Sequence, residues 1–398
     1  MRFVCGVSDE TALRLLKWSE FFLMFMLIIP VAVLLYQDKG ITLGDFFLIQ
    51  GLFRIAAFAL EIPSGYVSDV FSRRKVLFIG ALIWLAGNVG LYFAYGFWQI
   101  ALCEMSFGFA AALFSGTKEA YAYDLLKRMK REKQFLQENG SIATYASTAS
   151  FTATIAGGIL YPVLGNGIIA VETVAALLAV ICTFLLPELK EVRRKIAPES
   201  SPMQDVAKIV KMSVKHPEIN LFMLFPALFG AFTIVLLWIL QPTMEDAGVA
   251  VALFGFFVGL NQFSRILFSK FAHSAYERLG IRKILFLSVA AVVTAVAAVY
   301  GALLVKNMAF VYLCCAVIAV VAAMQKMYAL IHHRTASSER GTVISVSSMY
   351  ATMIQGGMLM LMKPLLDGWG IYWTMLVTLL LFATIWYPLQ KILKIEGI

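Results

Sequence analysis

The chain has 398 residues, of which 61% are hydrophobic and only 14% are charged, and its formal net charge is +9 at pH 7. Soluble globular domains carry about 25% charged residues, so this composition excludes an ordinary water-soluble globule and favours a protein whose apolar surface faces lipid. The basic residues are not interleaved with aromatic residues in a patch, so we expect no nucleic-acid partner.

Continuous apolar runs recur along the whole sequence, and each is long enough to cross the hydrocarbon core of a bilayer as a helix. Membrane-spanning strands would alternate with a period of two, which these runs do not do. The fold class is therefore predicted to be an all-α membrane protein with twelve transmembrane helices. The predicted spans are 14–36, 44–68, 75–94, 97–124, 140–162, 166–187, 219–241, 250–272, 282–303, 308–331, 341–363 and 369–391.

The positions of lysine and arginine predict the orientation. If the N-terminus is inside, the inner segments hold about 26 of the basic residues, whereas the reverse orientation would place this excess outside. The external side then keeps only Lys39, Lys306 and Lys363. We therefore predict a multi-pass protein of a prokaryotic inner (cytoplasmic) membrane, with both termini in the cytoplasm.

The longest polar stretch lies between the sixth and seventh spans. It includes a segment in which Val206 and Ile209 share one helical face while Lys208 and Lys211 share another. This pattern predicts a basic amphipathic helix on the anionic inner leaflet, although an ordinary linker is compatible with it. The predicted parts are an N-terminal six-helix bundle (1–187), a cytoplasmic linker (188–218) and a C-terminal six-helix bundle (219–398).

The two halves share several short patterns. The loop Gly65–Lys75 carries an acid followed by basic residues, and Glu277–Lys283 repeats this order at the matching place of the second half. Two pseudo-symmetric bundles with a cavity between them are a known plan of transporters. Further matches at equivalent spans are Lys118 with Lys326, and Gly157-Gly158 with Gly356-Gly357.

The first of these loops resembles the signature of the major facilitator superfamily, Gly-x-x-x-Asp-(Arg/Lys)-x-Gly-(Arg/Lys)-(Arg/Lys). The matching residues are Gly65, Asp69, Arg73 and Arg74, whereas Val70 and Ser72 depart from the pattern. The resemblance covers essentially the whole chain, and Leu60–Gly65 and Ser115–Thr117 are similar to a bacterial, drug-antiporter-like subgroup. It implies two six-helix halves that rock around a site near the membrane midplane.

The resemblance also implies a cytoplasmic gate. In the family, the loop aspartate engages the start of helix 11, where free backbone N–H groups favour an anion. Here Asp69 would dock near Arg340, supported by Arg73 and Arg74, in the loop that begins at Gly65. The alternative is that these charges are only signals of membrane topology.

Ionisable residues inside spans are costly and mark functional sites by default. Arg54 and Glu61 lie on one face of the second span, and Glu104 lies in the fourth span at a depth similar to that of Arg54. The two could form a structural ion pair. In proton-coupled family members an Arg-x-x-x-Gly pattern occupies this part of helix 4, and here Glu104 stands in place of the arginine while Gly108 is kept. Glu104 could therefore carry a proton or attract a cationic substrate.

For the other polar residues near the spans, the sequence is compatible with a functional role and with a structural or interfacial one. Glu20 is either an interfacial charge or a coupling residue. Lys118 and Lys326 either form a gate at the inner mouth or extend to the lipid headgroups. A polar cluster in the eighth span either contacts substrate or forms a buried structural network; its members are Asn261, Gln262 and Arg265.

The sequence contains no phosphate-binding loop of the kind that drives ATP-dependent pumps, and no nucleophile–base arrangement or metal-ligand spacing. We therefore predict a non-enzyme without a cofactor or metal. The predicted function is secondary active transport of a small organic molecule by alternating access, with the proton as coupling partner and efflux as the direction, in a monomer surrounded by membrane lipids. The alternatives are an uptake symporter or facilitator for a polar metabolite, a lipid flippase, and a non-transporting sensor.

Overall fold

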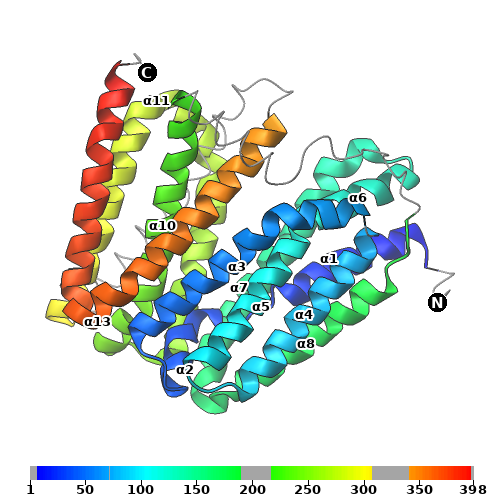
Figure 1. Ribbon diagram of the computed structural model, residues 1–398, viewed down its shortest axis with the longest axis horizontal. Coiled ribbons are helices and arrows are strands. Elements are labelled where there is room, and N and C mark those ends of the chain that lie inside the picture. Colours follow the sequence, from blue (N-terminus) through cyan, green and yellow to red (C-terminus); the bar gives the residue numbers. More distant parts are fainter. Residues whose placement is uncertain (1–6, 71, 190–216, 307–339, 396–398) are drawn as a thin grey trace. The chain divides into compact units, whose positions relative to one another are not determined.

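The computed structural model describes residues 7–70, 72–189, 217–306 and 340–395 (Figure 1). Only the backbone is described in 61–70, 217–226, most of 261–289, 340–348 and nearly all of 379–395. The regular elements within these ranges are helices. They are α1 (Asp9–Leu23), the 3₁₀ turn η1 (Ile29–Val31), α2 (Ala32–Asp38), α3 (Leu43–Val70), α4 (Arg73–Phe93), α5 (Phe97–Phe114), α6 (Thr117–Arg128), η2 (Glu132–Gln134), α7 (Phe135–Leu164), α8 (Gly167–Leu185), α10 (Pro217–Asp246), η3 (Val251–Leu253), α11 (Phe254–Val305) and α13 (Arg340–Ile395).

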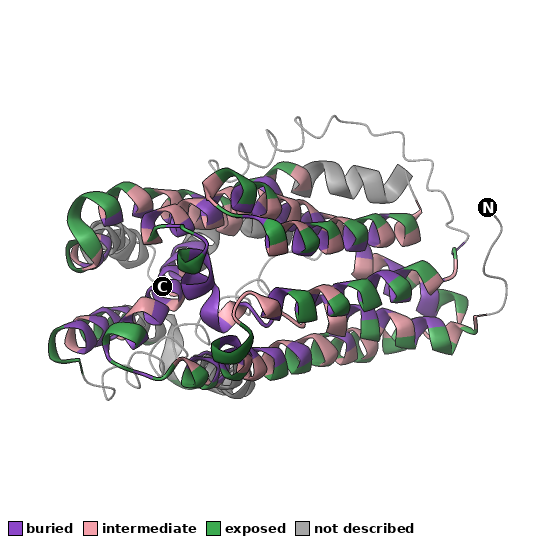
Figure 2. Ribbon diagram, turned by 90° about the horizontal axis from the view of Figure 1, so that it is seen from below, coloured by how far each residue is buried: buried purple, intermediate pink, exposed green. Residues whose placement is uncertain are grey.

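Six stretches of the described residues are long and apolar enough to cross a membrane: Leu43–Leu60, Arg73–Phe93, Phe97–Arg128, Glu132–Leu164, Gly167–Leu185 and Ala227–Asp246. Buried and exposed positions lie on different sides of these helices (Figure 2). Many exposed positions are large and apolar, as at Phe93, Trp98 and Val163. An apolar outer surface suits lipid and not water. The all-helical membrane class is confirmed, while the number of twelve helices remains a prediction.

The chain forms two compact units. One contains Met1–Ile29 and Leu52–Ala207, and the other contains Pro30–Gly51 and Lys208–Ile398. In the first unit α4 packs on α5 and α8, and α1 packs on α7 and α8. The predicted domain limits at residues 187 and 219 remain predictions.

In the second unit α10 packs on α11 and α13, and α2 packs on α10. The N–H of Val33 donates to Oε1 of the buried Gln241 over 2.9 Å. Lys363 donates to Asp45 over 2.6 Å and to Asp367 over 2.7 Å. These contacts hold α2 and the first turns of α3, which precede residue 52, in the same unit as α10 and α13.

The first predicted span, 14–36, is not one continuous helix, which corrects the sequence-based prediction. Helix α1 ends at Leu23 and the chain resumes a helical path only at Ile29. Pro30 explains this interruption, because proline has no N–H to donate and its ring collides with the carbonyl four residues earlier. We call residues 24–28 the helix 1 break.

The fourth predicted span, 97–124, is also interrupted. Helix α5 ends at Phe114 and α6 begins at Thr117, with Gly116 between them at a φ of 73°. This left-handed conformation costs a residue with a Cβ about 1–2 kcal/mol, so glycine is the residue that permits the change of direction. Together α5 and α6 still form one candidate membrane span.

The structure also bears on two further predicted boundaries, the start of the last span and the loop at Glu277–Lys283. Helix α13 is interrupted at Gly370 (φ 72°), next to the predicted start of the last span. The loop predicted at Glu277–Lys283, in contrast, lies inside α11, so this part of the prediction was wrong. The segment contains one glycine and no proline, so its residues tolerate a helical backbone. The 52 residues of α11 would extend about 78 Å as a straight helix, more than one bilayer crossing requires.

Candidate functional site

The crossing of α3 and α5 brings Arg54 and Glu104 to the same region of the first unit. Gly108 lies against α3 so closely that a Cβ there would overlap the carbonyl oxygen of Phe53 and come within 3.1 Å of the Cβ of Ala56. Glu104 lies one helical turn before Gly108, on the same face of α5, and is only 9% exposed. It is within electrostatic range of Arg54. The structure thus brings together the two charged residues that the sequence suggested as neighbours.

Glu20 and Lys118 form an ion pair. The Nζ of Lys118 lies 2.5 Å from Oε1 of Glu20, and Glu20 is only 6% exposed. Lys118 is the second residue of α6, directly after the turn at Gly116, so the interruption of the fourth span positions its side chain. The partner of Lys118 in this structure is therefore a carboxylate of α1. Lys326, its predicted counterpart in the second half, lies outside the described residues.

Glu172 is a buried acid in α8 that the sequence analysis did not identify. It is 5% exposed, and its Oε2 accepts a hydrogen bond of 3.2 Å from the N–H of Ile28. The backbone amide of Leu27 lies beside the same carboxylate, and Glu104 is within electrostatic range. The signal for this residue was a lone acid in the otherwise apolar run Gly167–Leu185.

The arginines of the predicted gate are engaged within the first unit. Arg73 donates to the carbonyl of Ala120 over 3.0 Å and forms an ion pair with Asp124 of α6. Arg74 donates to the carbonyl of Phe184 over 2.6 Å, and its guanidinium lies over the Phe184 ring. These contacts fix the start of α4 against α6 and α8.

Several predicted residues cannot be placed as side chains. Docking of Asp69 near Arg340 remains a prediction. The backbones of α3 and α11 contain Gly65 and the five residues Glu61, Asp69, Asn261, Gln262 and Arg265, whose side chains lie outside the described ones.

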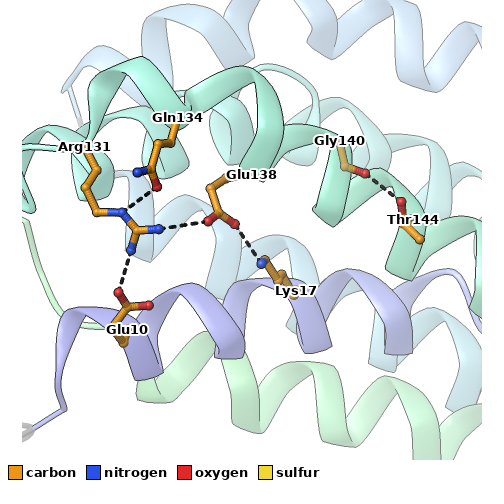
Figure 3. A network of polar contacts seen from close by, with 7 residues as sticks. All are labelled: Glu10, Lys17, Arg131, Gln134, Glu138, Gly140 and Thr144. Carbon is orange, nitrogen blue, oxygen red and sulfur yellow. Dashed lines mark hydrogen bonds and ion pairs between the residues drawn. The ribbon is translucent and has the colours of Figure 1, made fainter.

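A polar network joins the beginning of α1 to the junction between α6 and α7 (Figure 3). Arg131 donates to Glu10 over 2.5 Å, to Gln134 over 2.7 Å and to Glu138 over 3.3 Å. Lys17 lies 2.8 Å from Glu138. These residues belong to segments that the basic-residue distribution predicts to be cytoplasmic, and the network holds α1 against the start of α7.

Comparison with known proteins identifies the family. The model of the Major Facilitator Superfamily matches residues 20–356. The chain belongs to the Major Facilitator Superfamily. An uncharacterized transporter of Buchnera aphidicola is 24% identical over 176 residues, which are 43% of each chain. An uncharacterized MFS-type transporter of Methanocaldococcus jannaschii is 29% identical over 147 residues, 36% of this chain and 35% of that protein. The chain thus matches less than half the length of these relatives.

Solved transporter structures share the fold of this Major Facilitator Superfamily protein. The nucleoside transporter NupG aligns with a TM-score of 0.80 at 14% identity, covering 98% of this chain and 100% of NupG. A D-xylose-proton symporter aligns with a TM-score of 0.70 at 13% identity, covering 96% and 98%. Membership of this family and the long apolar helices make the chain a multi-pass membrane protein, and the family is one of transporters and not of enzymes.

Proposed function

We propose that this transporter exports a small organic molecule across the inner membrane by alternating access and exchanges it for protons. The observation that carries the proposal is a set of three carboxylates inside candidate spans or their flanking helices, each less than a tenth exposed. These are Glu20, Glu104 and Glu172. Acids buried at membrane depth are rare and commonly form proton relays. In proton-coupled transport such a group is loaded from one side and unloaded to the other as the two halves rock.

The proposed direction has a sequence basis. Ser115–Thr117 resembles the helix 4 pattern of drug-antiporter-like family members, and this segment contains the turn that positions Lys118. An exporter of this kind would recognise an amphipathic organic molecule, for which carboxylates and aromatic rings are suitable contacts. Trp18 of α1 is 43% exposed and packs against Tyr145 of α7 at 5.4 Å between ring centroids.

Uptake of a polar metabolite is the second candidate, and the exposed hydroxyl groups of α7 favour it. Thr144, Ser147, Thr148 and Thr152 each donate to a carbonyl one turn earlier in their own helix, over 2.8–2.9 Å. Their oxygen lone pairs remain available to hydrogen-bond donors of a polar ligand. The same back-bonding also makes a hydroxyl compatible with lipid, so only transport measurements can separate the two candidates.

Flux into proteoliposomes with an imposed pH gradient tests both candidates. Ethidium represents organic cations, uridine represents nucleosides and D-xylose represents sugars. Exchange for protons predicts that an acidic interior accelerates uptake of ethidium, whereas symport predicts that an acidic exterior accelerates uptake of uridine or xylose. Protein-free liposomes and a protonophore are the controls. Uptake that requires the protein but ignores the gradient would contradict proton coupling.

A further inference from the structure

The helix 1 break follows the end of α1, and its backbone N–H groups do not all continue the helical hydrogen-bond pattern. Met24 still donates to the carbonyl of Glu20, but the N–H of Met26 turns to Met24. The N–H of Ile28 instead donates to the carboxylate of Glu172, which lies 144 residues away in the sequence, and the Leu27 amide lies beside the same carboxylate. Leu27 is 1% exposed and Ile28 is 8% exposed. Water therefore has little access to these amides, and the carboxylate satisfies that of Ile28.

Glu172 has no cation beside it among the described residues, where none of the lysine or arginine ion pairs includes it. The helices packed on α8 are α1, α4 and α7. Their acids are occupied elsewhere, since Glu20 pairs with Lys118 and Glu138 pairs with Lys17. The charged group within electrostatic range is Glu104 of α5. The remaining charged and titratable residues of the packed helices are Asp9, Glu10 and Arg14 of α1, Arg73, Arg74, Lys75 and Tyr92 of α4, and Tyr145 and Tyr161 of α7. The amide hydrogen bond from Ile28, with the Leu27 amide beside it, thus stands in for a counter-ion to this carboxylate.

Asn88 of α4 offers an acceptor for a hydrogen bond from protonated Glu172. Asn166, next to the start of α8, donates to the carbonyl of Tyr92, and Arg74 donates to the carbonyl of Phe184. These two contacts show that α4 and α8 run antiparallel, and interpolation between them places Asn88 within about one helical turn of the level of Glu172. Asn88 is fully buried, and its Oδ1 has no hydrogen-bond donor in the described part of the chain. A protonated carboxyl at this level would supply the missing donor.

We propose that Glu172 is a proton-binding site that controls the helix 1 break. As a carboxylate it accepts the hydrogen bond of the Ile28 amide, with the Leu27 amide beside it. When it binds a proton, the group loses its negative charge, so the charge-assisted hydrogen bond to the amide weakens and the break loosens. The break lies directly before Pro30, where the chain passes from the first compact unit to the second. Protonation of Glu172 would therefore act on a segment that joins the two units, which is how a proton could drive alternating access. This inference rests on the proposed proton coupling.

Hydrogen exchange of the full-length protein in lipid nanodiscs tests the site without a substrate. After correction for the intrinsic pH dependence of exchange, residues 24–31 of the unmodified protein should exchange about tenfold faster at about pH 5 than at about pH 8, the factor expected when one charge-assisted hydrogen bond weakens. Glu172→Gln should exchange fast at both pH values. Glu188→Gln, which alters an exposed acid just beyond α8, is the matched control and should behave like the unmodified protein.

Two results would overturn the proposal. The first is an exchange rate of residues 24–31 in the unmodified protein that does not change with pH, and the second is an exchange rate in Glu172→Gln that still changes with pH. If Glu172→Gln does not fold, Glu172→Asp keeps the charge on a shorter side chain. It should protect residues 24–31 less well at about pH 8, and their exchange should still respond to pH. Asn88→Ala removes the oxygen that would accept a hydrogen bond from protonated Glu172. The pH at which the exchange rate changes should therefore fall, and an unchanged value would reject the role of Asn88.

Gradient-driven flux distinguishes this inference from the proposed function. The probe is whichever of ethidium, uridine and D-xylose the unmodified protein moves. If the unmodified protein ignores the gradient, the proposed coupling fails. If it responds and Glu172→Gln responds equally, only the role of Glu172 fails. A response that is lost in Glu172→Gln and kept in Glu188→Gln supports both.

Discussion

At the scale of single residues, the close contact between α3 and α5 depends on Gly108. A Cβ at this position would overlap the carbonyl oxygen of Phe53. The backbone cannot move aside as a flexible side chain could, so Gly108→Ala should lower stability by about 1–3 kcal/mol and weaken the approach of Glu104 to Arg54. Thermal unfolding of the purified protein measures the effect.

Gly140 of α7 provides the matched control for Gly108. No atom lies within 4 Å of a Cβ built at Gly140. Alanine also has the higher helix propensity, by about 1 kcal/mol, so Gly140→Ala should leave the unfolding temperature unchanged or raise it. Equal effects of the two substitutions would show that helix propensity, and not the contact with Phe53, determines the result at Gly108.

The ion pair between Glu20 and Lys118 should behave as a coupled pair. Glu20 is almost fully buried, so Lys118→Met leaves a carboxylate without its counter-charge and should cost about 2–4 kcal/mol. Glu20→Gln should cost less, because Lys118 is partly exposed and its side chain can extend to water. The double variant should be more stable than the sum of the single effects predicts. Additive unfolding shifts in this double-mutant cycle would mean that the pair contributes nothing measurable.

Some of these residues could be predicted from the sequence and others could not. Glu104 and Arg54 stood out because charges within apolar runs are rare, and their similar depth suggested that they are neighbours. Glu172 is equally rare in its run, but its role depends on the amide of Ile28, 144 residues away. That amide became available only because Pro30 interrupts the first span, and a count of apolar residues does not detect such an interruption.

At the scale of elements, the turn between α5 and α6 requires a left-handed residue at Gly116. No atom lies within 4 Å of a Cβ built there, so the strain of a substitution comes from the backbone alone. Gly116→Ala should lower stability by about 1–2 kcal/mol. Gly116→Asn should cost less, because asparagine adopts this conformation more readily. Unfolding temperatures in the order glycine, asparagine, alanine would support this explanation, and equal values for the two variants would contradict it.

Apolar length predicted the existence of the helices better than their continuity. The runs gave α4, α8 and α10 nearly to their observed limits, because each is one uninterrupted helix in the structure. The first and fourth spans were predicted as single helices, although Pro30 and Gly116 lie inside them. The fourth run, Phe97–Arg128, still forms one candidate membrane span after the helix is interrupted, whereas only the shorter apolar helix Ile29–Asp38 follows the interruption of the first. Glu172 accepts a hydrogen bond from the backbone N–H of Ile28 at the first interruption. Local sequence patterns carry no information about such a long-range contact.

At the scale of the whole molecule, orientation is the property on which the transport direction depends. The basic residues predict that the segment between α6 and α7 is cytoplasmic and that the segment between α4 and α5 is external. Helices α5 and α6 together form one candidate span, so these two segments flank a single crossing. Lys133 and Tyr95 are exposed residues of the two segments, and each can carry a reporter cysteine.

Cysteine labelling in intact cells measures this orientation. The background variant replaces the five native cysteines with serine: Cys5, Cys103, Cys182, Cys314 and Cys315. A membrane-impermeant maleimide should then label Tyr95→Cys in intact cells and Lys133→Cys only after the membrane is permeabilised. Asn166→Cys, between α7 and α8, is a second external position and should follow Tyr95→Cys. The opposite pattern would place the basic loops outside. It would also reverse the sides from which Glu20 and Glu172 exchange protons, and with them the direction of the proposed export.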